Sequence, residues 1–316
     1  MEVNSFMEWR KSELKKIIFM LMVLIVGTVH GENITYKKNK KILTSIQAVY
    51  SIAKSLTKDT DIEVYSIFDS DVSMDYGKSA FDNKDLDLSS AKDAVAVVDV
   101  AKIWHNDYLY EYARRKNIRI VEIDASYSFS GNDYLSLSLL NYKNGDRNPY
   151  VWMSFQNVIK MANIVSDDLS ELFPEDGKKI EDNLEKFSQE IKKIENEYLE
   201  KTLDLSSLSV ITLTENLDYL FNDLNIFFNY VDSNELTVEK ISEVMKRNNS
   251  KIFVSDRWIK KEIINEIEKK GGKFLVLDNF NIPRELNEKM DPDGYLKGMK
   301  ENMEKLVEVM KIMDKK

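Results

Sequence analysis

Residues 175–202 have the sequence EDGKKIEDNLEKFSQEIKKIENEYLEKT, which contains a single glycine and no proline. Its apolar residues follow one another at steps of 4, 3, 4, 3 and 4, and they are Ile180, Leu184, Phe187, Ile191, Ile194 and Tyr198. This spacing predicts a helix with one narrow apolar stripe. At about 1.5 Å per residue, the helix is about 40 Å long. It is either a coiled-coil dimer helix or, more simply, a backbone that crosses two halves of one chain.

A second helix is expected directly before this one. Its apolar stripe runs from Phe155 to Leu172, and the sequence Phe173-Pro174-Glu175-Asp176 then interrupts it. Proline disfavours the helical conformation in the residue that precedes it, so the first helix ends there. We therefore assign residues 148–203 to linking helices, of which the longer forms a spine.

The residues before these helices have the pattern of a parallel α/β lobe. Short apolar runs typical of strands occupy 42–45, 62–68, 94–100 and 118–123, and helical spacing occupies 48–56 and 104–115. The run 94–100 shows no alternation, as expected for a strand that is buried on both faces. Strands that alternate with helices favour a parallel, doubly wound sheet. We assign this lobe to residues 32–147.

The residues after the spine repeat the pattern. Strand-like runs are expected at 208–213, 226–231, 251–254 and 274–277, and helices at 217–223, 237–247, 258–270 and from 295 to 313. We assign this second lobe to residues 204–316. The fold class is therefore α/β, with two Rossmann-like lobes bridged by a long helix.

The first thirty-one residues have the layout of a secretory signal peptide. A basic region with Arg10, Lys11, Lys15 and Lys16 precedes an apolar run over 17–26, and small or polar residues follow. Val29 and Gly31 take the positions that precede a cut before Glu32. The alternative is a retained anchor, but the run is short for the roughly 20 residues that span a bilayer. We expect a soluble periplasmic or secreted product.

The composition excludes several classes of protein and site. The 316 residues contain no cysteine and two histidines, and the formal net charge is -9. Disulfides, thiolate zinc sites and attachment of a lipid to an N-terminal cysteine are therefore excluded. A net negative charge argues against a nucleic-acid binder. The sequence has neither a glycine-rich phosphate loop nor a Gly-x-Ser-x-Gly or His-Glu-x-x-His motif, so we predict no enzymatic activity.

One stretch resembles a known family. Asn148-Pro149-Tyr150-Val151-Trp152, followed by a short helix, a Pro-Glu break and a long helix, is similar to the solute-binding proteins of zinc and manganese ABC importers. That family carries Asp-Pro-His-x-Trp at this place. Weaker similarity extends over 210–220, 274–278 and the last helix. The resemblance implies an extracytoplasmic protein, monomeric, that captures a metal ion in a cleft between its lobes for an ABC permease and its ATPase.

The family's four metal ligands, typically three histidines and one carboxylate, are mostly replaced in this chain. By position they correspond to Met74, Tyr150, Thr214 and Asp278, and the histidine-rich loop of the family is missing. Asp75 and Glu215 are further oxygen donors near these positions. Oxygen ligands suit a hard divalent or trivalent cation better than zinc. The resemblance thus implies a metal as the bound solute but leaves its identity open.

Other interpretations stay open at this level. The site has either been reassigned to another solute or lost its transition metal. The chain would then be a binding or adhesin-like protein that uses the same scaffold. His105 is either a substitute ligand or, more simply, a surface or helix-cap residue.

Overall fold

The computed structural model describes residues 40–68, 73, 76–82, 89–128, 133–287 and 289–315. The predicted signal peptide, Met74 and Asp75 lie outside these residues. The residues from Lys40 onward form one compact unit. No helix among the described residues is both long enough and apolar enough to cross a membrane.

The first sheet is parallel and has the strand order β2-β1-β3-β4. Its strands are β1 (Lys41–Thr44), β2 (Glu63–Ser66), β3 (Ala96–Asp99) and β4 (Val121–Asp124). The central strand β3 is buried along its whole length, as the lack of alternation predicts. The connecting helices are α2 (Gln47–Leu56), α3 (Lys78–Phe81) and α4 (Leu109–Arg114), with a 3-10 turn η2 at Ser89–Lys92 and another, η3, at Asp133–Leu135.

The second sheet has the same design, with the order β6-β5-β7-β8. It contains β5 (Ser209–Thr212), β6 (Phe227–Tyr230), β7 (Ile252–Ser255) and β8 (Lys273–Val276). Helices α7 (Asp218–Asp223), α8 (Ile241–Asn248) and α9 (Lys261–Lys269) connect them, with a 3-10 turn η5 at Val238–Lys240. A two-stranded ribbon, β9 (Glu285–Leu286) and β10 (Lys289–Met290), follows.

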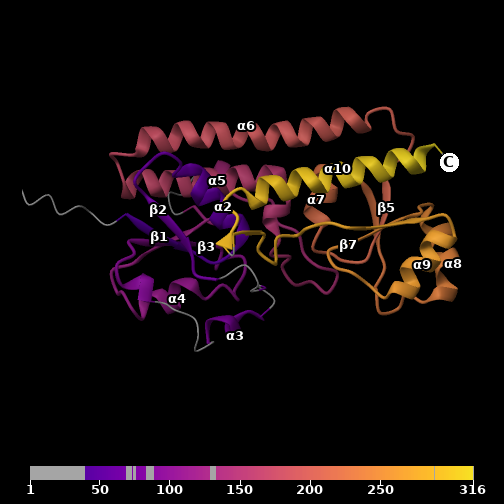
Figure 1. The fold of residues 1–316 in the computed structure, drawn as a ribbon, viewed down its shortest axis with the longest axis horizontal. Coiled ribbons are helices and arrows are strands. Elements are labelled where there is room, and N and C mark those ends of the chain that lie inside the picture. The colour runs from indigo at the N-terminus through magenta and orange to yellow at the C-terminus, as the bar shows by residue number, and fades with distance from the viewer. Residues whose placement is uncertain are drawn as a thin grey trace, which may run out of the picture. The chain divides into compact units, whose positions relative to one another are not determined.

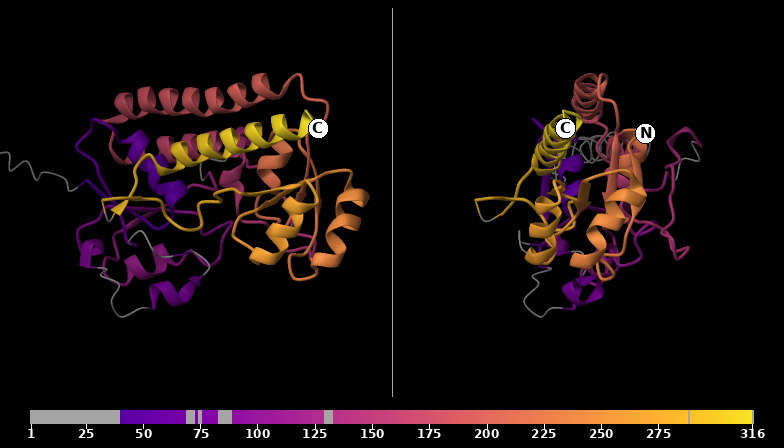
Figure 2. Two further views of the ribbon diagram at one scale, coloured as in Figure 1. Left: turned by 45° about the vertical axis from the view of Figure 1, so that its right-hand side comes forward. Right: turned by 90° about the vertical axis from the view of Figure 1, so that its right-hand side faces the viewer.

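Two long helices connect the sheets as the sequence predicts. After η4 (Val151–Met153), α5 spans Phe155–Leu172 and α6 spans Gly177–Thr202. The predicted stripe is buried against the rest of the chain at Ile180, Phe187, Ile191 and Tyr198. In Figures 1 and 2, α6 runs along both halves of the described chain. The two α/β lobes bridged by a long helix are therefore confirmed.

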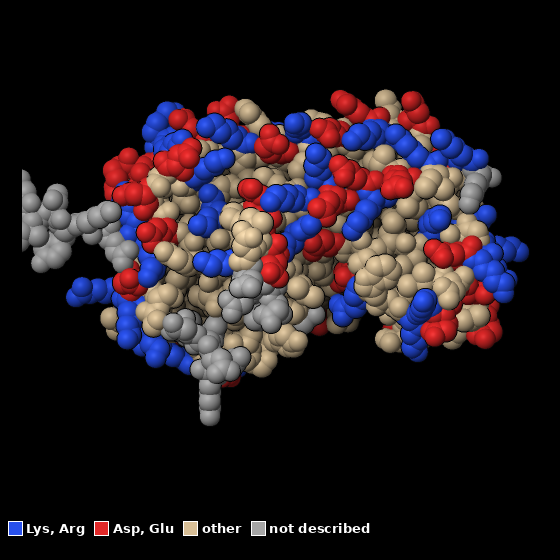
Figure 3. All heavy atoms as spheres, viewed as in Figure 1, with Lys and Arg blue, Asp and Glu red and all other residues tan. Residues whose placement is uncertain are grey.

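The last helix, α10 (Gly294–Asp314), forms a second bridge that the sequence did not indicate. It lies beside α6 in both figures and also packs on α2 of the first lobe and on β7 and β8 of the second. Its two ends are tied to the two halves: Tyr295 N donates to Ser51 Oγ on α2, and Asp314 accepts from Ser206 N near β5. Acidic and basic side chains alternate along the exposed face of these two helices (Figure 3).

One helix is shorter than the pattern predicts. We expected helical structure over 104–115, but α4 begins at Leu109. The reason is the buried carboxylate of Asp107, which accepts from the backbone N–H of Leu109 at 3.3 Å and from Ser45 Oγ at 2.9 Å. Trp104 turns into the core instead, and His105 lies exposed in the turn before the helix.

Candidate functional site

Residues 142–148, at the end of the first lobe, make contacts with the second half of the chain. Tyr142 donates its hydroxyl to Asn216 Oδ1 at 2.8 Å, and the N–H of Lys143 donates to Glu215 Oε1 at 2.7 Å. Asn148 donates from Nδ2 to the carbonyl of Glu215 at 2.8 Å. The segment is thereby held against the turn that follows β5, the turn in which Thr214 and Glu215 lie.

Tyr150 lies in an aromatic cluster rather than in open space. Its ring is 5.7 Å from that of Trp104 and 5.2 Å from that of Trp152, and only 3% of the residue is exposed. Trp152 is fully buried and donates its indole N–H to the carbonyl of Asn279 at 2.9 Å. The cluster therefore connects the segment 148–154 to the loop after β8, where Asp278 lies.

Thr214 lies at the carboxyl edge of the second sheet. Its hydroxyl accepts from the N–H of Asn216 at 3.2 Å, so it already stabilises the turn that follows β5. Together with Glu215 it lines an open cavity of about 1130 Å³, which Tyr142, Tyr230 and Trp258 also line. Tyr150 and Asp278 are not among the described residues that line this cavity.

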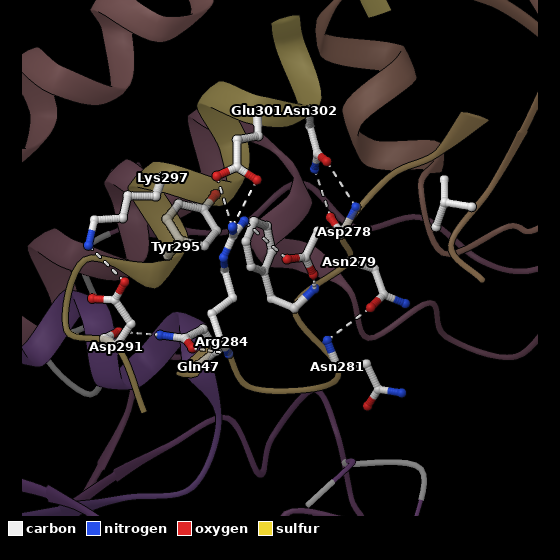
Figure 4. Close-up of polar contacts among 12 residues, drawn as sticks. Gln47, Asp278, Asn279, Asn281, Arg284, Asp291, Tyr295, Lys297, Glu301 and Asn302 are labelled. Carbon is white, nitrogen blue, oxygen red and sulfur yellow. Dashed lines mark hydrogen bonds and ion pairs between the residues drawn. The ribbon is translucent and has the colours of Figure 1, made fainter. Parts of the chain in front are cut away.

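Asp278 has a network of its own (Figure 4). Its Oδ1 accepts from the N–H of Phe280 at 2.8 Å, and its Oδ2 lies 3.5 Å from Nη1 of Arg284. Arg284 in turn makes a bidentate ion pair with Glu301 on α10, at 2.8 and 2.9 Å. Burial raises the pKa of the Asp278 carboxyl, and the nearby Arg284 and Lys305 oppose that rise. Asp278 is thus already next to a fixed cation.

Asn302 holds the loop around Asp278 in place. Asn302 accepts from the backbone N–H of Asp278 at 2.9 Å and donates to its carbonyl at 2.8 Å. In Figure 4 the side chain of Asn281 points away from this network. Asn281 is 6% exposed, and its Oδ1 has no hydrogen-bond partner within the described part of the chain.

Asp256 is a residue at this edge that the sequence interpretation missed. Its side chain is 1% exposed, and its Oδ2 accepts from Asn216 Nδ2 at 2.6 Å and from Asn279 Nδ2 at 2.9 Å. Its Oδ1 accepts from Arg257 Nε at 3.1 Å. The available signal was its place directly after the buried strand β7, because ligands of open α/β sheets bind at the carboxyl ends of the strands.

The three predicted ligand positions that the structure describes, Tyr150, Thr214 and Asp278, are therefore distributed around one junction. Trp152 connects Tyr150 to Asn279, and Asp256 connects Asn279 to Asn216, the neighbour of the Thr214–Glu215 turn. That Met74, Tyr150, Thr214 and Asp278 hold one ion stays a prediction, as does a contribution from Asp75. His105 is exposed, as expected for a surface residue.

Comparison with known proteins gives a family. The family model described as "Zinc-uptake complex component A periplasmic" matches residues 42–309, which include both sheets and the bridging helices. No curated protein matches the sequence.

Solved structures share the fold. A mutant of FpvC from Pseudomonas aeruginosa superposes with a TM-score of 0.69 at 16% identity, over 86% of this chain and 99% of that one. FpvC in complex with Mn²⁺ gives 0.67 at 16%, over 87% and 100%. The Zn(II)-bound ZnuA-like domain of AdcA from Streptococcus pneumoniae gives 0.65 at 17%, over 86% and 99%.

Proposed function

Because the chain belongs to the family of the periplasmic component A of zinc-uptake complexes, we propose that it captures a metal ion between its two lobes and delivers it to an ABC permease and its ATPase. The observation that carries this proposal is the extent of the match, which covers residues 42–309 and so includes both halves of the junction. The proposed role is binding and delivery, without chemistry on the solute.

The donors at the proposed site favour a hard cation over zinc. The positions that correspond to three histidines hold a thioether, a phenol and a hydroxyl, at Met74, Tyr150 and Thr214. Zinc sites in proteins use thiolate, imidazole and carboxylate. Oxygen donors from Asp278, Thr214, Glu215 and Asp75 suit manganese, calcium or iron(III). Because Arg284 lies beside Asp278, the cation must compete with a guanidinium for that carboxylate.

Elemental analysis of the purified full chain tests the proposal, followed by thermal-shift screening of metal-stripped protein against divalent and trivalent ions. We expect one ion to raise the melting temperature in a saturable manner, and Asp278→Ala to abolish that rise. Asp314→Ala is the control, because it removes an acidic side chain at the far end of α10. This variant should keep the rise in melting temperature. If no ion gives a rise that depends on Asp278, capture of a metal at this junction is disproved.

Export is a second part of the proposal. The family description places its members in the periplasm, and we propose that this chain is cut before Glu32 and released there. N-terminal sequencing of the exported form should begin near Glu32. Recovery of the full-length chain in the membrane fraction would contradict cleavage.

A further inference from the structure

Three carboxylates meet at the carboxyl edge of the first sheet, and none of them belongs to the proposed cleft site. Asp99 ends β3, and Glu122 and Asp124 lie on β4; each offers an oxygen within 4.8 Å of the others. The strand register brings them together, since Asp99 pairs directly with Asp124. Glu122 is two residues before Asp124 and so lies on the same face of β4.

Two of these carboxylates differ in how the protein satisfies them. Asp124 is fully buried and accepts from Lys102 N at 2.6 Å, from Ser126 N at 2.8 Å and from Ser126 Oγ at 2.5 Å. Asp99 is also fully buried, but its Oδ1 accepts from the N–H of Ala101 at a longer distance of 3.4 Å. Its Oδ2 has no hydrogen-bond partner among the described residues.

An unpartnered buried carboxylate beside two others is costly without a compensating positive charge. Lys102 and Arg114 are positively charged neighbours of Glu122, but Asp99 has the acids Asp107, Asp124 and Glu122 around it. The fourth acid nearby, Asp107, is satisfied by Ser45 and by backbone N–H groups, so it does not relieve Asp99. The carboxyl edge of the first sheet therefore has more hydrogen-bond acceptors than donors. The missing partner of Asp99 is a cation or a proton.

We propose that Asp99, Glu122 and Asp124 bind one hard divalent cation of the calcium type, independently of the ion carried in the cleft. Calcium takes carboxylate oxygens at about 2.3–2.6 Å, so ligands on opposite sides of it are separated by about 4.6–5.2 Å. The oxygens here lie within 4.8 Å of one another, which is compatible with binding of one such ion. Magnesium, at about 2.0–2.1 Å, requires a tighter set.

The cation also has a structural role in this arrangement. Asp124 already joins β4 to the turn after β3 through Lys102 N, and a shared ion adds Asp99 to that connection. Glu122 is partly exposed and gives the ion a route from solvent. The site then fixes the turn that places Trp104 against Tyr150.

Calorimetry and thermal unfolding of the metal-stripped full chain, titrated with CaCl₂ and in parallel with MgCl₂, test this site. We expect one Ca²⁺ per chain, weaker binding of Mg²⁺, and a melting temperature that rises with Ca²⁺. Asp99→Asn and Glu122→Gln should each lower the Ca²⁺ affinity by at least about tenfold, since affinity follows the number of charged ligands. Glu122 is partly exposed, so Glu122→Gln provides a variant with little risk to folding.

Asp218→Asn is the matched control, because Asp218 also has a buried oxygen without a hydrogen-bond partner in the described ranges but is not part of this group. It should leave Ca²⁺ binding unchanged, as should Asp278→Ala, which removes only the cleft ligand. Absence of Ca²⁺ binding in the wild type, or binding that neither Asp99→Asn nor Glu122→Gln weakens, overturns the proposal. Greater stability of Asp99→Asn without any effect of Ca²⁺ also overturns it and shows that the cluster holds a proton instead.

Discussion

Acidic side chains lie at the carboxyl edge of both sheets, but the surroundings of those acids differ between the two. In the second sheet, Asp256 accepts from two asparagine amides and an arginine, and Asp278 has Arg284 beside it. In the first sheet, Asp99 has a contact of 3.4 Å with the N–H of Ala101, and its Oδ2 has no hydrogen-bond partner in the described part of the chain. The comparison shows that arginine and asparagine side chains satisfy the acids of the second sheet. In the first sheet, Asp99 lacks such donors among the described residues.

The junction between these edges should show the largest effect on stability. Trp152→Ala removes a fully buried indole and leaves the carbonyl of Asn279 without its donor. We expect the free energy of unfolding to fall by about 3–5 kcal/mol, as for other buried aromatics replaced by alanine. Chemical denaturation measures this. Trp258→Ala is the control, since that side chain is 76% exposed, and its effect should stay within about 0.5 kcal/mol.

Arg284 is the cation beside Asp278 at the edge of the second sheet. Removing it would leave Asp278 as poorly compensated as Asp99 in the first sheet. Arg284→Met leaves both Asp278 and Glu301 without their guanidinium partner. Because the pair is partly exposed, we expect a loss of about 1–3 kcal/mol at neutral pH, less than for a fully buried pair. The carboxylate of Asp278 also becomes free for an added ion, so cation affinity should rise.

Arg257→Met provides the matched control for that change. Arg257 pairs with Asp256, which keeps both asparagine donors after the substitution. We expect a smaller loss of stability and no gain in ion affinity. Equal effects of the two variants would show that Arg284 has no special role at Asp278.

The smallest effect concerns pH. Burial, together with the charge of Glu215, raises the pKa of Asp218 to about 7. Between its unfolded and folded pKa values the folded state binds more protons than the unfolded state, so stability falls as pH rises toward 7. Asp218→Asn should remove part of this slope, by about 1 kcal/mol, because solvent screens the partly exposed side chain. Unfolding between pH 5 and pH 8 measures it, and an unchanged slope would disprove the assignment to Asp218.

The sequence predicted the arrangement of elements better than it predicted the contacts at the site. The periodic stripe of α6 and the short apolar strands are local signals, and each produced an element in its expected place. The shortened α4 shows the limit of such signals, since the helical spacing begins at Trp104 but the Asp107 carboxylate fixes the start at Leu109. Local periodicity does not record which buried polar group caps a turn.

The site was harder to predict because its contacts join distant parts of the chain. The position of Asp278 followed from the motif around it, but its ion pair with Arg284 depends on how the loop after β8 folds back against α10. Asp99 and Asp124 are adjacent only through strand register. The role of α10 as a second bridge is hidden for the same reason, because its amphipathic pattern does not reveal which sheets it covers.

Zinc calorimetry on metal-stripped full-length protein tests most directly whether the cleft has lost the family's imidazole site. We predict no tight, saturable zinc binding, because thioether, phenol and hydroxyl groups stand where three imidazoles are expected and Arg284 already neutralises the remaining carboxylate. Tight binding of one zinc ion per chain that Asp278→Ala abolishes would contradict this and show that other residues complete a zinc site at the junction.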